Sequence, residues 1–141
     1  MSGIEKLFLS FGGSGYLPIA PGTAGSILAF AVFTALREAL LLHPELRVSI
    51  LALLLLAMTI AAVPLITKHT SKRQPDASWI VVDEAVGVGI AILPYFFLTD
   101  YGLGHALVAL VAFRVFDIAK PLGIRRIDAE HTPLSVMLDD I

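Results

Sequence analysis

The feature that most constrains the fold is a run of 19 consecutive residues without a charge, Val48–Ile66. A helix crosses the hydrocarbon core of a bilayer with about 20 predominantly apolar residues, so this run is long enough to span a membrane. Pro64 falls near its end. The run therefore predicts a membrane-spanning helix.

Three further apolar segments, each carrying charges near one end, accompany this run: Ala24–Leu42, Trp79–Leu98 and Leu103–Ala119. Of the 141 residues, 57% are hydrophobic and 16% are charged, whereas a soluble domain typically has about 25% charged residues. We therefore predict an all-α, polytopic membrane bundle with about four transmembrane helices, forming a single domain over residues 1–141. A soluble bundle of buried helices is the alternative, since only one segment is wholly uncharged.

The basic residues predict the orientation of these helices. The N-terminus, the polar connection Thr67–Ser78 and the tail after Ala119 would share one side of the membrane. Together they carry seven basic residues: Lys6, Lys68, Lys72, Arg73, Lys120, Arg125 and Arg126. The connections on the other side carry Arg47, joined by Arg37 if the first helix ends early. Because basic loops mark the cytoplasmic side, both termini are expected in the cytoplasm.

Five charged residues lie close to the cytoplasmic ends of the predicted helices. Asp83 and Glu84 begin the third segment, and charges within membrane segments are costly and usually functional. Near the end of the fourth segment, Asp117 lies three residues from both Arg114 and Lys120, so Arg114 and Asp117 share a helix face, as do Asp117 and Lys120. The alternative without a functional role is that the carboxylates reach the membrane–water interface and that the Arg–Asp pair only stabilises the helix.

This set of side chains favours metal and phosphate chemistry. The chain has no cysteine and its four histidines are scattered, so a cluster of Asp and Glu would suit a hard cation with oxygen ligands, most simply Mg²⁺. The planar fork of Arg114 and the point charge of Lys120 would suit a phosphate. A net charge of −2 gives no indication of a nucleic-acid partner.

A stretch rich in glycine, proline and hydroxyl residues, "SGYLPIAPGTAGS", leads into the first segment. The free N–H groups at a helix start favour an anion, and Thr23 and Ser26 would add hydroxyls on one face. Small residues allow close approach of a ligand, here Gly12, Gly13, Gly15, Gly22 and Gly25. The stretch is thus either a phosphate cradle or an ordinary glycine-rich loop, and it lacks the lysine of a Walker loop.

Four motifs in register, "GSGYLPIAPGTAGS", "IVVDEAVG", "FRVFDIAKP" and "MLDD", make the chain resemble the phosphatidylglycerophosphatase A family from about Phe11 to Asp140. Members of this family are Mg²⁺-dependent bacterial membrane enzymes that remove the terminal phosphate of phosphatidylglycerophosphate. The resemblance therefore implies a lipid phosphatase of the bacterial inner membrane, with its active site on the cytoplasmic side.

The resemblance also implies residue roles. Catalytic roles fall on Asp83, Glu84, Asp117 and Thr23; substrate-binding roles on Pro21, Gly22, Gly25, Ser26, Arg114 and Lys120; and Mg²⁺-binding roles on Asp83, Glu84, Asp117, Asp139 and Asp140. Attack by a metal-activated water and an aspartyl-phosphate on Asp83 or Asp117 both remain open as mechanisms. A non-catalytic membrane subunit or an ion or proton transporter is the alternative function, and it predicts charges near the bilayer midplane.

Overall fold

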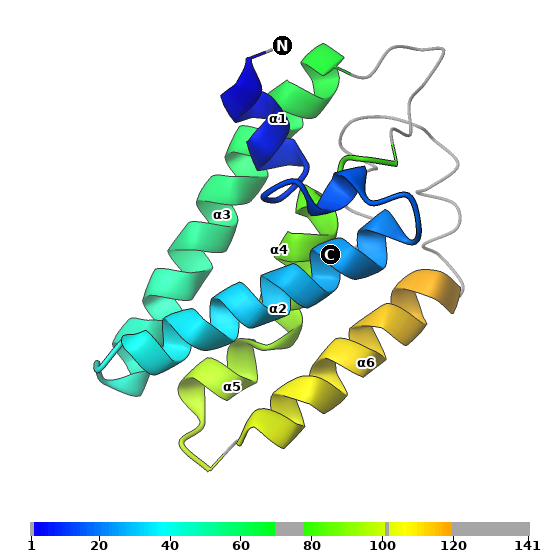
Figure 1. Cartoon of the computed structure of the whole chain (residues 1–141). Helices are drawn as coiled ribbons and strands as arrows, with labels where there is room; N and C mark the ends of the chain where they lie inside the picture. Colours follow the sequence, from blue (N-terminus) through cyan, green and yellow to red (C-terminus); the bar gives the residue numbers. More distant parts are fainter. Residues whose placement is uncertain (1, 70–77, 101, 120–141) are drawn as a thin grey trace.

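The chain folds as a bundle of helices in the computed structural model, which describes residues 2–69, 78–100 and 102–119 (Figure 1). Its elements are α1 (Gly3–Leu9), a 3₁₀ turn η1 (Ser14–Tyr16), α2 (Pro21–Ala39), α3 (Pro44–His69), α4 (Val82–Ala91), α5 (Leu93–Phe97) and α6 (Leu103–Ala119). Over these ranges there is no strand, so the predicted all-α class is confirmed. Lys120, Asp139 and Asp140 lie outside the described residues.

The helix starts follow from local sequence. At α1, Ser2 and Glu5 form a capping box, in which each side chain accepts a hydrogen bond from the other residue's N–H. At α2, Pro21 occupies the first turn, where its missing N–H would have had no helical partner. Gly12 and Gly13 turn the chain between α1 and η1 with φ of 71° and 92°, a region that glycine adopts without steric cost.

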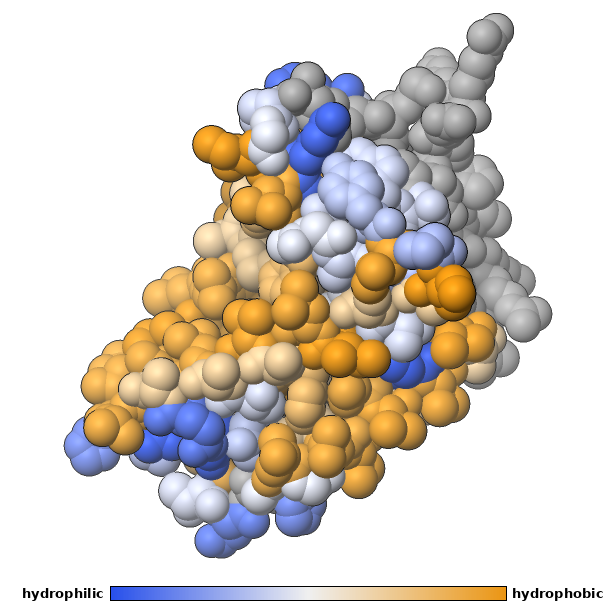
Figure 2. Space-filling model, in the orientation of Figure 1, coloured by the Kyte–Doolittle hydropathy of each residue, from blue (hydrophilic) through white to orange (hydrophobic). Residues whose placement is uncertain are grey.

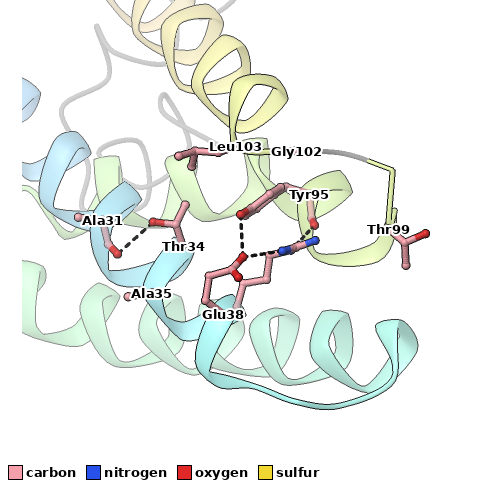
Figure 3. A pocket seen from close by; sticks show the side chains of 9 residues that line it. Ala31, Thr34, Ala35, Glu38, Tyr95, Thr99, Gly102 and Leu103 are labelled. Carbon is pink, nitrogen blue, oxygen red and sulfur yellow. Dashed lines mark hydrogen bonds and ion pairs between the residues drawn. The ribbon is translucent and has the colours of Figure 1, made fainter.

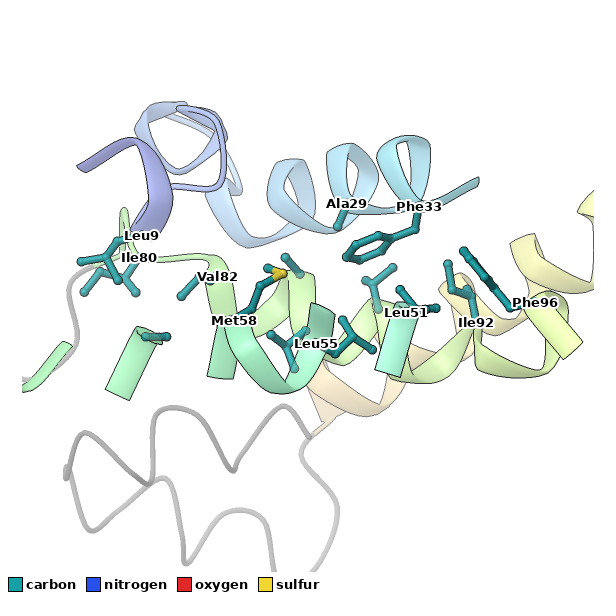
Figure 4. Packing of buried hydrophobic residues seen from close by; sticks show 14 of the residues in the cluster. Leu9, Ala29, Phe33, Leu51, Leu55, Met58, Ile80, Val82, Ile92 and Phe96 are labelled. Carbon is teal, nitrogen blue, oxygen red and sulfur yellow. The ribbon is translucent and has the colours of Figure 1, made fainter. Parts of the chain in front are cut away.

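Helix α4 forms the centre of the bundle. Seven of its ten residues are buried, and α2 and α3 pack against it. Figure 4 shows Phe33 of α2 and Leu51, Leu55 and Met58 of α3 converging on this region, with Ile92 and Phe96 closing one end. The buried residues of α3, from Leu51 to Ile66, recur every three or four positions, as one face of a helix must.

The predicted segment Trp79–Leu98 was wrong as a single continuous helix. The structure divides it into α4 and α5, which meet at Ile92. Pro94 accounts for the break, because a proline cannot donate the backbone hydrogen bond that would continue α4. Conversely, α3 runs past Pro64 to His69, beyond the expected end at Ile66.

One helix in the described part of the chain, spanning Pro44–Lys68, is long and apolar enough to cross a membrane. The four-span arrangement and the cytoplasmic termini therefore stay predictions. The surface is nevertheless strongly apolar: Figure 2 shows a broad hydrophobic band over α2, α3 and α6. Its exposed residues include Ile27, Val32, Leu53, Leu56, Ile60, Leu107, Val108, Val111, Val115 and Ile118. Large exposed apolar patches of this kind mark contact with a membrane or a partner.

Candidate active site

Three helix ends meet at one end of the bundle: the start of α2, the start of α4 and the end of α6 (Figure 1). Arg114 of α6 joins them. Its Nη2 donates to Thr23 Oγ1 at 3.2 Å and its Nη1 donates to Ser26 Oγ at 3.3 Å. Thr23 and Ser26 lie three residues apart on one face of α2, as their spacing predicts. The hydroxyl face of the glycine-rich stretch therefore holds a guanidinium in this structure.

Asp117 completes the environment of Arg114. Its Oδ2 lies 2.5 Å from Arg114 Nη1, in an ion pair between residues three apart on α6. The two side chains are only 18% and 12% exposed, Arg114 and Asp117 respectively. Because ion pairs are less screened when they are withdrawn from water, the attraction between these two charges is less screened than in a surface pair. The sequence prediction that Arg114 and Asp117 share a face is confirmed.

Glu84, in the first turn of α4, places its carboxyl group over Gly22 of α2. A Cβ built on Gly22 would collide with Glu84 Oε1, and would lie 3.2 Å from Glu84 Cδ and 3.8 Å from Arg114 Nη1. Glu84 and Arg114 therefore flank the same point above the start of α2.

Two polar atoms of these side chains are buried without a hydrogen-bond partner among the described residues: Glu84 Oε2 and Arg114 Nε. Buried polar atoms are nearly always paired in folded proteins, because leaving one unpaired costs about 1–3 kcal/mol. Because Glu84 and Arg114 flank the same point above Gly22, these two side chains are candidates for binding a charged ligand there.

The remaining predicted residues support this end of the bundle. Asp83 is 7% exposed in the first turn of α4, where the helix dipole favours a carboxylate. A Cβ on Gly25 would lie 2.9 Å from two side-chain carbons of Val81, so Gly25 allows α2 to approach the chain just before α4. Pro21 begins α2, whose start has no side-chain cap.

Sequence reasoning missed the contacts that fix the start of α4. The N–H of Val81 donates to the carbonyl of Leu9 at 2.9 Å, and the ring of Trp79 stacks on Tyr16 with centroids 5.8 Å apart. A Cβ on Gly15 would collide with the carbonyl oxygen of Trp79. The glycine-rich stretch was the available signal, but the sequence could not show that its close neighbour is the protein's own backbone.

No three Asp, Glu, His or Cys residues within the described ranges are grouped so that they could hold a metal ion. The structure brings together a set of residues that we call the Arg114 cluster: Gly22, Thr23, Ser26, Glu84, Arg114 and Asp117. Of the five predicted metal ligands, Asp139 and Asp140 lie outside the described residues, and Asp117 is engaged by Arg114.

A concave region of about 650 Å³ lies near the other end of α2. Arg37 donates from Nε to the carbonyl of Tyr95 at 2.8 Å and from Nη1 to Glu38 Oε1. Glu38 Oε1 also accepts from the Tyr95 hydroxyl, as Figure 3 shows. These hydrogen bonds pair the polar groups of Arg37, Glu38 and Tyr95 with one another and join α2 to α5. Arg37 is fifteen residues from Gly22, or roughly 22 Å along a helix, so this network is separate from the Arg114 cluster.

Comparison with known proteins agrees with the chemistry of the Arg114 cluster. The family model of phosphatidylglycerophosphatase A matches residues 7–141, so the chain belongs to that family. It is also 38% identical over 129 residues to a Bacteroides thetaiotaomicron protein named "Putative phosphatidylinositol-3-phosphatase", covering 92% of this chain and 79% of that protein. No solved structure matches the chain. The family and this relative together support a lipid phosphatase associated with membranes.

Proposed function

We propose that this protein hydrolyses phosphatidylglycerophosphate to phosphatidylglycerol and inorganic phosphate, with Mg²⁺, at the cytoplasmic edge of the bacterial inner membrane. The observation that carries the proposal is the pair of unpaired buried atoms, Glu84 Oε2 and Arg114 Nε, at the meeting point of three helix ends. The family match supplies the substrate, phosphatidylglycerophosphate.

Arg114 is the proposed phosphate-binding group. A guanidinium has five N–H donors. Thr23 accepts from one of the two donors at Nη2, and Ser26 and Asp117 engage the two donors at Nη1. The Nε–H and a second Nη2–H are left for a ligand, and two guanidinium donors bind two phosphate oxygens side by side. Thr23, Ser26 and Asp117 therefore act by holding the guanidinium in place, so that it need not be ordered when the substrate arrives.

Glu84 and Asp83 are the proposed holders of Mg²⁺. Mg²⁺ usually keeps several waters and takes only one or two protein carboxylates besides the substrate phosphate, so the buried Glu84 Oε2 beside Asp83 fits it without a third acid. When bound, the ion supplies positive charge to the phosphate oxygens and lowers the pKa of water. Asp139 and Asp140 stay predicted contributors, whereas the ion pair of Asp117 with Arg114 favours an orienting role for Asp117.

Hydrolysis at this site needs two contributions from the protein's own residues. Arg114 binds the terminal phosphate and opposes the charge that develops on its oxygens. Glu84, adjacent to Arg114, is placed to accept a hydrogen bond from an attacking water. As the water oxygen bonds to phosphorus, the bond from phosphorus to the lipid oxygen breaks. One proton of the water passes by way of the Glu84 carboxylate to the lipid oxygen, which leaves as the alcohol of phosphatidylglycerol, and the phosphoryl group leaves as inorganic phosphate. An aspartyl-phosphate on Asp83 remains the competing mechanism.

A second candidate substrate is phosphatidylinositol 3-phosphate, because the relative's name specifies a phosphatase for that lipid. Both lipids carry a phosphate monoester group, so the same Arg114 cluster could bind either. The test is release of inorganic phosphate by purified protein in detergent, with each lipid, with Mg²⁺ and with a chelator. Faster Mg²⁺-dependent release from phosphatidylglycerophosphate supports the proposal. Faster release from phosphatidylinositol 3-phosphate would make that lipid the substrate instead. Release of phosphate from neither lipid would contradict the proposed function.

A further inference from the structure

Gly22 is a glycine that neither its backbone nor its helix requires. It is the second residue of α2, its φ is not positive, and any amino acid can adopt this helical conformation. A glycine inside a helix is less favourable than alanine. Something outside the backbone must therefore account for the missing side chain.

The space above Gly22 is filled by the carboxyl group of Glu84. A Cβ there would collide with Glu84 Oε1 and approach Glu84 Cδ to 3.2 Å. The Glu84 carboxyl group can therefore occupy this place above α2 only because position 22 has no side chain. The same Cβ would lie 3.8 Å from Arg114 Nη1, an ordinary contact distance that Arg114 tolerates.

We propose that Gly22 is a positioning residue, whose missing side chain seats the Glu84 carboxylate beside Arg114. A methyl group at position 22 would push the carboxylate away from the guanidinium and from the point that both flank. Part of this inference, the effect on turnover, rests on the proposed function. The steric part does not, because it concerns Glu84 and Gly22 alone.

The steric part is tested by a double-mutant cycle measured as Tm in detergent. Gly22→Ala should lower the Tm by roughly 3–10 °C in the wild-type background, but should lower it little or not at all in a Glu84→Ala background, where the colliding carboxyl group is gone. Equal losses in the two backgrounds would overturn the proposal. If Gly22→Ala alone yields no folded protein, folded Gly22→Ala/Glu84→Ala protein supports the proposal and an unfolded double variant contradicts it.

Two glycines serve as controls. Gly104 is the second residue of α6 and a Cβ there would meet nothing within 4 Å, so Gly104→Ala should not lower the Tm in either background. Gly25→Ala would collide with Val81 instead of Glu84, so its Tm loss should be the same with and without the Glu84 side chain. If Glu84→Ala removes the Tm loss of Gly25→Ala as well, the coupling with Glu84 is not specific to position 22, and the proposal is overturned.

The functional part is tested by kinetics of the full chain with phosphatidylglycerophosphate and Mg²⁺. Displacement of a catalytic group by about 1 Å can cost on the order of 100-fold in turnover, so Gly22→Ala should lower kcat to that extent and raise the Mg²⁺ concentration for half-maximal rate. A stable Gly22→Ala protein with wild-type kcat and Mg²⁺ dependence would contradict the functional part of the proposal, because Gly22 would then affect packing alone. A wild-type protein without phosphatase activity would instead contradict the proposed function, while the Tm cycle would still decide the steric claim.

Discussion

At the scale of single residues, the structure changes the reason why the hydroxyls of α2 matter. The spacing of Thr23 and Ser26 predicted a shared face, and that prediction is confirmed. Their contact with Arg114, more than 80 residues away in sequence, was not predictable, because helical periodicity gives the face of a helix and not its partner. Nor could the sequence show that Gly22 faces Glu84, since a glycine gives the same signal for a turn, a ligand or a close side chain.

Replacing Arg114 by lysine tests the guanidinium itself. A lysine side chain would keep the charge but could not contact Thr23, Ser26 and Asp117 while also offering two parallel donors to a phosphate. Loss of a hydrogen bond to a charged group costs about 1.5–3 kcal/mol, so we expect turnover on phosphatidylglycerophosphate to fall on the order of 10- to 100-fold. The control is Arg37→Lys in the network with Tyr95, which should lower the Tm but leave turnover unchanged. Equal loss of turnover in both variants would contradict a specific role for Arg114.

Thr23→Ala tests how Arg114 is held. The variant removes the oxygen that accepts from Arg114 Nη2, and we expect about a tenfold loss of turnover, with less than about 1.5 kcal/mol lost in stability. Thr23→Ser keeps the oxygen and should retain most of the activity. The measurement is kcat and Tm for the two variants side by side. If the serine variant is as poor as the alanine variant, the methyl group and its packing, rather than the hydroxyl, are what matter at this position.

At the scale of elements, apolar runs located the long helices well. The predicted segment Leu103–Ala119 coincides with α6, and Val48–Ile66 lies inside α3. Helices α1 and η1 were not predicted, because they are short and are stabilised by a capping box and by contacts with the segment before α4. The division of Trp79–Leu98 at Ile92 was also missed, although Pro94 was the available signal.

Gly15→Ala tests whether η1 fixes the start of α4. A Cβ at Gly15 would collide with the backbone carbonyl of Trp79, which cannot move aside as a flexible side chain can. We expect a loss of more than about 2 kcal/mol in stability, together with reduced turnover, because the chain from Trp79 leads directly into the turn that carries Asp83 and Glu84. The control is Gly3→Ala, which would meet nothing within 4 Å. Unchanged stability and turnover in Gly15→Ala would show that η1 can shift without disturbing α4.

At the scale of the whole molecule, the convergence of polar groups at one end was predicted from the basic residues. The sequence predicts that the starts of the first and third segments and the end of the fourth share one membrane edge, and the structure brings those three helix ends together. It does so through α4, which is buried between α2 and α3. The number of membrane spans stays a prediction, since neither α2 nor α6 meets the length and composition of α3.

The orientation in the membrane can be tested with single cysteines, because the chain has none of its own. Lys68 near the end of α3 and Leu103 at the start of α6 are both exposed. We expect Lys68→Cys to react with an impermeant thiol reagent from the cytoplasmic side and Leu103→Cys to react from the opposite side. Labelling of both from the same side would contradict the predicted orientation and the cytoplasmic location of the Arg114 cluster.

The central claim is that Glu84, Arg114 and the start of α2 form one phosphatase site. The most direct measurement is the turnover of Glu84→Gln on phosphatidylglycerophosphate at saturating Mg²⁺, with the Tm recorded on the same sample. Glutamine keeps the size of the side chain but removes its negative charge, so the fold should persist. We predict that turnover falls at least about 1,000-fold, equivalent to roughly 4 kcal/mol of transition-state stabilisation. The Tm should stay close to that of the wild type. A folded Glu84→Gln protein that retains wild-type turnover would contradict the central claim.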